Sequence, residues 1–217
     1  MGAMGTAKEK RKKPQDKKDR ILQTTMQLLL KKGGYNSTST TDICNACKLT
    51  RPTLYHYFGS KRNLFFSLHM FSIERILKPY MATAAAIEDP LERLRFMIRS
   101  YATTICNHPE LRILIHDTLT INDRYFREVR EEWKEHYLLL RSTITQLQSK
   151  GVIDKSVNPS LGPLFLLGMT TWMAFWFDRN GKSTAEELAE AVLRFSLQGL
   201  GRKDRETTEN PAIDSGP

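Results

Sequence analysis

Four polar side chains share one face of a short helix predicted over residues 51–58. They are Arg51, Thr53, Tyr55 and His56. The opposite face carries Leu54, Tyr57 and Phe58 at the i, i+3, i+4 spacing of a buried stripe. An arginine guanidinium can donate two hydrogen bonds to guanine O6 and N7, so we expect Arg51 to distinguish DNA sequences. Thr53 and His56 could meet other base edges or a thymine methyl group.

A second set of side chains is suited to phosphate oxygens, which fix the register of a protein on DNA without reading its sequence. Thr40 and Thr41 begin one predicted helix and Lys61 begins another, where free backbone N–H groups also favour anions. Tyr55 offers a hydroxyl to the same partner. Exposed threonine and histidine side chains are also often only solvated, and His56 in particular could contact nothing.

Three helices are predicted to position these groups. Apolar residues recur at helical spacing from Lys17 to the Gly33-Gly34 stop, and this pattern indicates the first helix. The capping run 36–42 predicts a short second helix that carries Ile43 and Ala46 inward.

A turn at 48–50, with Leu49 closing the junction, leads to the third helix. Thr50 suits its N-cap, and Pro52 falls in its first turn, where the missing N–H costs nothing. Gly59 ends this helix, and Ser60 caps a fourth, expected to run to about Leu77 before Pro79 perturbs it.

This region resembles the DNA-binding domain of the TetR family of transcriptional regulators over residues 21–64. The resemblance rests on Gly34-Tyr35, Thr38-Ser39, Ile43-x-x-Ala46 and the run from Thr53 to Lys61, Thr-Leu-Tyr-His-Tyr-Phe-Gly-Ser-Lys. Two positions depart from the family pattern: Lys48 and Pro52 stand where glycine is common. Lysine can adopt the left-handed conformation at a modest penalty, so the motif is weakened without being broken.

The charge distribution supports a polyanion partner for the N-terminal third. Up to Asn63 the chain has 14 Lys/Arg against 4 Asp/Glu, and the remainder has 19 against 20, although the whole carries +9. Double-stranded DNA, with a palindromic operator, is the partner that the resemblance implies. A basic protein that binds membrane surfaces or nucleic acid non-specifically is the alternative.

The remainder of the chain is also predicted to be helical, which makes the protein all-α. Expected helices cover 90–107, 109–118, 123–150, 159–179 and 184–200, the last opened by a Ser183-x-x-Glu186 capping box. We expect a cloning scar and disordered basic arm over 1–16, and a helix-turn-helix domain with its linking helix over 17–77. A ligand-binding and dimerisation bundle over 78–201 and a disordered tail over 202–217 follow.

The resemblance implies a homodimer and a small-molecule effector. Dimerisation is assigned to the last two long helices, and the same stripes could instead be internal core. Their apolar residues are Leu161, Leu164, Phe165, Gly168, Trp172, Phe175 and Trp176, with Leu188, Val192, Phe195 and Gly199. An apolar effector cavity is assigned to Met97, Tyr101, Phe126, Trp133, Tyr137, Met169 and Trp172, although core packing accounts better for each of them taken singly.

The stretch from Gly168 to Glu186 is similar to family members that respond to acyl-CoA thioesters. Under that resemblance Arg179 would meet a phosphate of an acyl-CoA effector.

The sequence lacks the motifs that would indicate an enzyme or a metal-binding protein. No nucleophile elbow, P-loop, dinucleotide fingerprint or His-Glu-x-x-His is present, so we expect no enzyme and no cofactor. Cys44 and Cys47 form a C-x-x-C pair without two further ligands, so we expect no metal and two small residues on a short helix. Without a signal peptide or a membrane-spanning run, a cytoplasmic protein with no membrane partner is expected.

Overall fold

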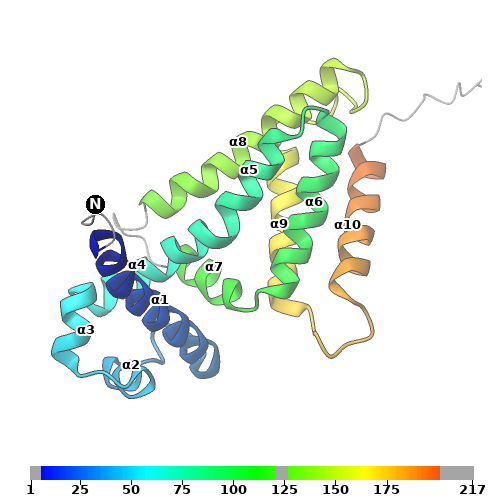
Figure 1. Cartoon of the computed structure of the whole chain (residues 1–217). Coiled ribbons are helices and arrows are strands. Elements are labelled where there is room, and N and C mark those ends of the chain that lie inside the picture. Colours follow the sequence, from blue (N-terminus) through cyan, green and yellow to red (C-terminus); the bar gives the residue numbers. More distant parts are fainter. Residues whose placement is uncertain (1–5, 121–126, 201–217) are drawn as a thin grey trace, which may run out of the picture.

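Helices make up the architecture of the computed structural model, which describes residues 6–120 and 127–200 (Figure 1). No strand occurs in these ranges, as the all-α prediction requires. In chain order the elements are α1 (Thr6–Lys32), α2 (Thr40–Cys47), α3 (Arg51–Phe58), α4 (Lys61–Ser72), the π-helical turn η1 (Ile73–Leu77), α5 (Lys78–Ala86), α6 (Pro90–Asn107), α7 (Glu110–Thr120), α8 (Arg127–Ser149), α9 (Gly162–Trp176) and α10 (Ala185–Leu200).

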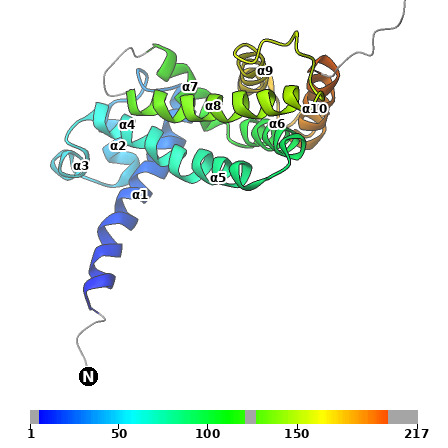
Figure 2. The same ribbon diagram turned by 90° about the horizontal axis from the view of Figure 1, so that it is seen from above.

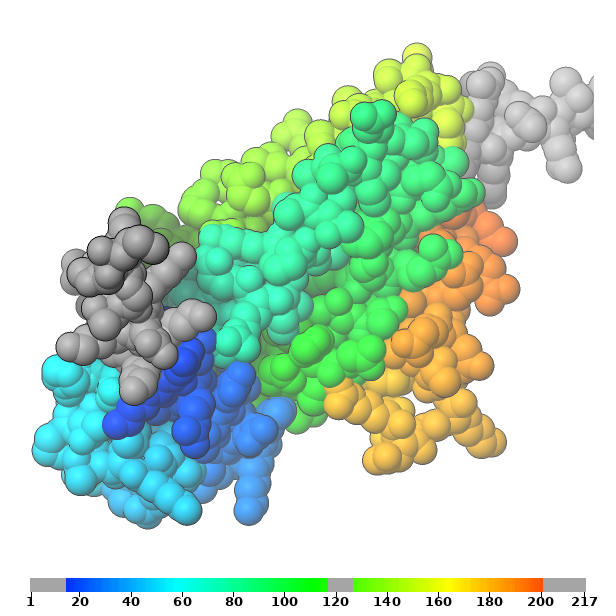
Figure 3. Space-filling model, viewed as in Figure 1, coloured from blue at the N-terminus to red at the C-terminus, as the bar shows by residue number. Residues whose placement is uncertain are grey.

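The N-terminal helices form a lobe at one end of an elongated body (Figures 1 and 3). Leu22 and Leu29 of α1, Ile43 of α2 and Leu54 of α3 are buried together in its core. The same core includes Ile113 of α7, so the lobe is packed onto the body rather than tethered to it. A movement of α7 would therefore displace the helices of the lobe, including α3 with its polar face.

The body is built around α6, with α9 and α10 beside it and α8 crossing from the lobe to the far end (Figures 1 and 2). Its core joins Leu94 and Met97 of α6 to Ile144 of α8, Met173 of α9 and Leu193 of α10. Each of these side chains is at most 3% exposed. This second core confirms a helical bundle behind the N-terminal helices.

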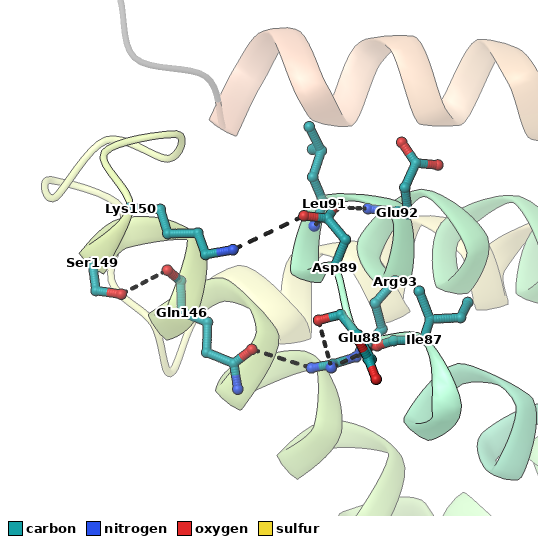
Figure 4. Close-up of polar contacts among 9 residues, drawn as sticks. All are labelled: Ile87, Glu88, Asp89, Leu91, Glu92, Arg93, Gln146, Ser149 and Lys150. Carbon is teal, nitrogen blue, oxygen red and sulfur yellow. Dashed lines mark hydrogen bonds and ion pairs between the residues drawn. The ribbon is translucent and has the colours of Figure 1, made fainter.

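Polar contacts fix the far end of the body, where the connection between α5 and α6 meets the end of α8 (Figure 4). Asp89 caps α6 by accepting hydrogen bonds from the N–H groups of Leu91 and Glu92, both at 2.9 Å. The Arg93 guanidinium donates to the Ile87 carbonyl at 2.7 Å and to the Gln146 side chain at 3.2 Å. These contacts hold α8 against α6 at the end farthest from α3.

Some helix boundaries differ from the sequence-based prediction. The α1 helix begins at Thr6, so residues 6–16, which were expected to be a disordered arm, continue the helix. The capping box of α10 pairs Thr184 with Glu187, one residue later than expected, because this start places Ala185 and Ala189 on the buried face. The tail over 202–217 and Phe126 lie outside the described residues.

Pro79 does not end the fourth helix. The helical path continues through η1 into α5, with right-handed helical backbone at Ile73 and Lys78. Pro79 lacks the N–H that a continuous helix would use for a bond to the preceding turn, and the π-helical turn η1 lies directly before it. A continuous helical rod therefore links the N-terminal lobe to the body.

Candidate functional site

Caps specify the start of α2 and the turn that joins it to α3. Ser39 and Asp42 form a reciprocal capping box at the start of α2. Lys48 then adopts the left-handed conformation, with φ 54° and ψ 49°, and its N–H donates to the Asn45 carbonyl. Thr50 caps α3 by accepting a hydrogen bond from the Thr53 N–H at 3.3 Å. Lysine thus occupies the position where the family commonly has glycine, in the conformation that glycine would adopt.

The burial pattern of α2 corrects one prediction. Ala46 is exposed, whereas Ile43 and Cys44 are buried. Cys47 is half-buried beside α1, where its sulfur lies 4.0 Å from Thr25 Oγ1. Because positions i, i+1 and i+4 of a helix share one face, burial of Ile43 and Cys47 directs Ala46 outward.

The predicted polar face of α3 is presented to solvent. Leu54 and Phe58 are buried, whereas Arg51, Tyr55 and His56 are exposed. Tyr57, which was predicted in the core, is only half-buried. This arrangement leaves the polar side chains of α3 available to a partner outside the lobe.

Thr41 lies beside this face and holds its arginine. Arg51 Nη2 donates a hydrogen bond to Thr41 Oγ1 at 2.6 Å, which joins the first turns of α2 and α3. Thr41 is exposed and Thr40 is half-buried. The structure therefore brings the predicted contacts of α2 and α3 onto one surface.

Lys61 has a structural partner that the sequence did not reveal. Its Nζ donates to the Tyr35 carbonyl at 2.8 Å and lies 4.1 Å from the centre of the Tyr35 ring. Burial lowers the pKa of Lys61 below its ordinary value. The side chain thus fastens α4 to the end of α1, and two further ammonium hydrogens remain for a phosphate.

Acidic charge near this surface is neutralised locally. Lys32 Nζ lies 2.6 Å from Asp42 Oδ1. The hydrogen bond from Lys32, and then those from Ser39, hold the pKa of Asp42 well below its usual range. Asp42 therefore stays ionised and paired, and it repels an approaching polyanion less than an isolated carboxylate would.

A cavity lies between the lobe and the body, bounded by α4, η1, α5, α6, α7 and α8. Its volume of about 60 Å³ is small compared with ligand sites of roughly 300–1,000 Å³. A ligand of ordinary size would therefore have to displace its walls. Its lining residues are His69, Ser72, Ile73, Ile76, Leu77, Tyr80, Tyr101, Thr104, Ile105, Leu111, Leu114, Ile115, Val129, Trp133 and His136.

Three aromatic side chains form a buried polar cluster on one wall of this cavity. The Tyr80 hydroxyl donates to the Met97 carbonyl at 3.2 Å and lies 2.9 Å from His136 Nε2. The ring centroids of Tyr101 and His136 are 4.8 Å apart, nearly edge to face. Burial lowers the pKa of His136 to about 4 and raises that of Tyr101 to about 12, so both are neutral near pH 7.

Seven of the eight residues predicted to bind an effector lie within the described ranges, and they separate into two groups. Tyr101 and Trp133 line the cavity. Met97 lines a smaller void beside α9, and Tyr137 lines a surface groove next to Trp133.

The structure does not place the other three at the cavity. Trp172 is 62% exposed and stacks on Phe175. Met169 packs against the body core. Exposed Arg179 donates to the Cys106 carbonyl at 3.1 Å. Helical spacing could not decide between inward and outward faces because α9 is apolar on nearly all sides.

Sequence reasoning missed His69, Tyr80 and His136. His69 is 3% exposed, and its two ring nitrogens lie 3.0 Å from the Phe65 carbonyl and 3.1 Å from the Leu114 carbonyl. It therefore links α4 to α7 across one wall of the cavity. A histidine within a buried apolar stripe was the available signal, and the tertiary contacts alone show its role.

An exposed apolar surface covers α9 and α10, and we call it the α9–α10 face. Phe165 is 70% exposed and Phe195 is 68% exposed. Monomeric proteins rarely expose large contiguous apolar patches. Leu161 at the N-cap of α9, and Leu164, Trp172 and Trp176 within it, are between 45% and 62% exposed. An ideal Cβ on Gly168 or Gly199 would meet no heavy atom within 4 Å, so another helix could approach closely there.

Within residues 6–120 and 127–200, no group of three or more His, Cys, Asp or Glu side chains could hold a metal ion. No helix in those ranges is long and apolar enough to cross a membrane.

Comparison with known proteins agrees with this geometry. A family model for bacterial regulatory proteins of the tetR family matches residues 21–68. A model of the tetracyclin repressor-like C-terminal domain matches residues 88–200. The HTH-type transcriptional repressor KstR2 of Mycolicibacterium smegmatis is 23% identical over 193 residues, covering 86% of this chain and 92% of the relative.

Solved structures share this fold over most of the chain. AibR in complex with isovaleryl coenzyme A and operator DNA has a TM-score of 0.77 at 26% identity, covering 82% of this chain and 97% of AibR. KstR2 of Mycobacterium tuberculosis has a TM-score of 0.76 at 19% identity, covering 86% and 95%, which shows the shared fold. The chain is therefore a member of the TetR family of transcriptional regulators, with a DNA-binding N-terminal domain and the family's C-terminal domain.

Proposed function

We propose that this chain is a homodimeric repressor that binds a palindromic operator and is released by a small apolar or acyl-CoA-like effector. The observation that carries the proposal is the exposed polar face of α3, where Arg51 is held by Thr41 at 2.6 Å. In a helix-turn-helix the second helix enters the major groove, so this face would meet base edges. Thr40, Tyr55 and Lys61 would contact phosphates, and Thr53 and His56 would contact bases. Such a regulator would act in the cytoplasm.

Dimerisation follows from the α9–α10 face. A palindromic operator requires two copies related by a two-fold axis, with half-sites about 34–36 Å apart. Phe165 and Phe195 would be covered by the partner, and Gly168 would allow its helix to approach. The same symmetry would place α3 of each copy on one side of the DNA.

Release by an effector would use the rod formed by α4, η1 and α5. Ser72, Ile73 and Ile76 line the cavity near the junction of α4 and η1. Because the 60 Å³ cavity is too small for an ordinary effector, binding would move these walls and with them α4. His69, which bonds α4 to α7, would transmit the displacement. An effector that prefers the displaced state would then separate the two α3 helices from their half-sites.

An acyl-CoA-like effector is supported by AibR, whose complex contains isovaleryl coenzyme A. Arg179 lies outside the cavity, so a different cation would have to meet the phosphates. A groove of about 480 Å³ runs along α8 and contains Arg130 and Lys134. It shares Ile115 and Trp133 with the cavity, so an acyl chain could enter there while the phosphates stayed in the groove.

The decisive experiment is selection of genomic fragments with the purified protein, followed by binding measurements at two salt concentrations. We expect a palindromic site, and the Arg51→Ala variant should lose discrimination while keeping salt-dependent non-specific binding. Absence of an enriched site would overturn the proposal. Binding to anionic vesicles without sequence preference on DNA would instead support the membrane-surface alternative.

A further inference from the structure

His136 lines the cavity and has a hydrogen-bonding atom whose role the fold does not explain. Tyr80 has a single hydroxyl proton, and it donates that proton to the Met97 carbonyl. The 2.9 Å contact between Tyr80 Oη and His136 Nε2 can be a hydrogen bond at the same time only if the histidine Nε2–H donates it. A neutral imidazole carries one N–H, so Nδ1 of His136 is left with a lone pair.

Nδ1 of His136 has no hydrogen-bond partner among the described residues. The side chain is 2% exposed, and burial holds its pKa at about 4, so the ring cannot carry a second proton at pH 7. Buried polar atoms in folded proteins are nearly always hydrogen-bonded. Because His136 lines the cavity, a ligand bound there can supply the missing donor.

The chemistry of the other lining residues restricts that ligand. The cavity lining contains no Lys, Arg, Asp or Glu among the described residues. A carboxylate or ammonium group placed there would lose its hydration without an opposite charge to replace it. Apolar side chains such as Ile105 and Leu114 form most of the remaining wall.

We propose that His136 Nδ1 accepts a hydrogen bond from a hydroxyl or N–H group of an uncharged effector moiety, whose apolar remainder fills the cavity. This inference rests on the effector-binding part of the proposed function and specifies the chemical class that is bound. A hydroxylated acyl chain or an amide N–H of a thioester cofactor meets the requirement. A free carboxylate at the same position does not.

The test compares phenol with toluene, which have nearly the same size and differ in the donor. Dissociation constants are measured by calorimetry on the wild-type protein and on His136→Phe, which keeps a ring and leaves the Tyr80 bond to Met97 intact. For each protein the dissociation constant of toluene is divided by that of phenol. Because the hydration of the free ligands is the same in both measurements, it cancels when the ratios of two variants are compared. We expect this ratio to fall about tenfold in His136→Phe, because loss of one hydrogen bond weakens binding by about that factor.

The matched control is His108→Phe, at the end of α6 and outside the cavity. It should keep the wild-type ratio. A second measurement needs no variant: the ¹⁵N resonance of His136 Nδ1 should move when phenol is added and should not move with toluene.

An unchanged ratio in His136→Phe would overturn the inference, as would an unmoved Nδ1 resonance with phenol bound. Failure of both probes to bind the wild type would do the same, because the cavity would then admit no small aromatic ligand. These measurements use the protein without DNA. Failure of the repressor proposal, seen as no enriched operator, is therefore a separate result.

Discussion

Arg51 and Thr41 are joined by a hydrogen bond of 2.6 Å between the guanidinium Nη2 and the threonine Oγ1. The contact holds the arginine at the start of α3, where the first turn of a recognition helix meets base edges. Its planar fork is thus partly ordered before any DNA is bound. Ordering in advance lowers the entropic cost of forming a specific contact.

Arg51→Ala should weaken operator binding by about 1–3 kcal/mol and affect scrambled DNA much less, because a bidentate base contact is lost. Thr41→Val should have a smaller effect in the same direction, since it only frees the arginine. Fluorescence anisotropy with both DNAs measures this. Arg99→Ala, on α6 and paired with Glu190 at 2.8 Å, is the control. Equal losses on operator and scrambled DNA would make Arg51 a phosphate contact instead.

Lys48→Gly should stabilise the protein relative to Lys48→Ala by about 1 kcal/mol. Both substitutions remove the same charge, but only glycine adopts φ 54° without steric cost. Urea unfolding followed by circular dichroism gives the two free energies. If the two variants unfold at the same urea concentration, the left-handed turn does not carry the expected penalty.

Phe165→Glu should convert the proposed dimer to a monomer, because a carboxylate would be buried without a partner in the α9–α10 face. Phe165 is 70% exposed in the single chain. Sedimentation velocity reports the state directly. The control is Leu138→Glu on α8, where the leucine is 37% exposed. A Phe165→Glu protein that remains dimeric would place the interface elsewhere.

His136 should make folding stability fall as the pH decreases from 6.5 to about 4. Its pKa is lowered from 6.5 to about 4 by burial, so in this interval the unfolded chain binds a proton that the folded chain excludes. The loss should reach at most about 3 kcal/mol. His136→Phe should lack this part of the pH dependence in urea unfolding. An identical slope in the variant would show that His136 is protonated in the folded state.

The sequence by itself determined the DNA-binding motif, because its signals are local. Caps such as Thr50, the proline of the first turn and the apolar spacing of Leu54 and Phe58 act within a few residues. They specify where α3 begins, where it ends and which face it buries. The exact limits of α6, from Pro90 to Asn107, were predictable for the same reason.

Only the tertiary structure decided which apolar face is core, cavity or exposed surface. On α9, apolar residues lie on nearly every side, so spacing could not show that Trp172 points to solvent while Met173 is buried. The pairing of Tyr80 with His136 joins residues that are 56 positions apart. Such contacts depend on how α5, α6 and α8 cross, and the packing of whole helices sets that crossing rather than any local signal.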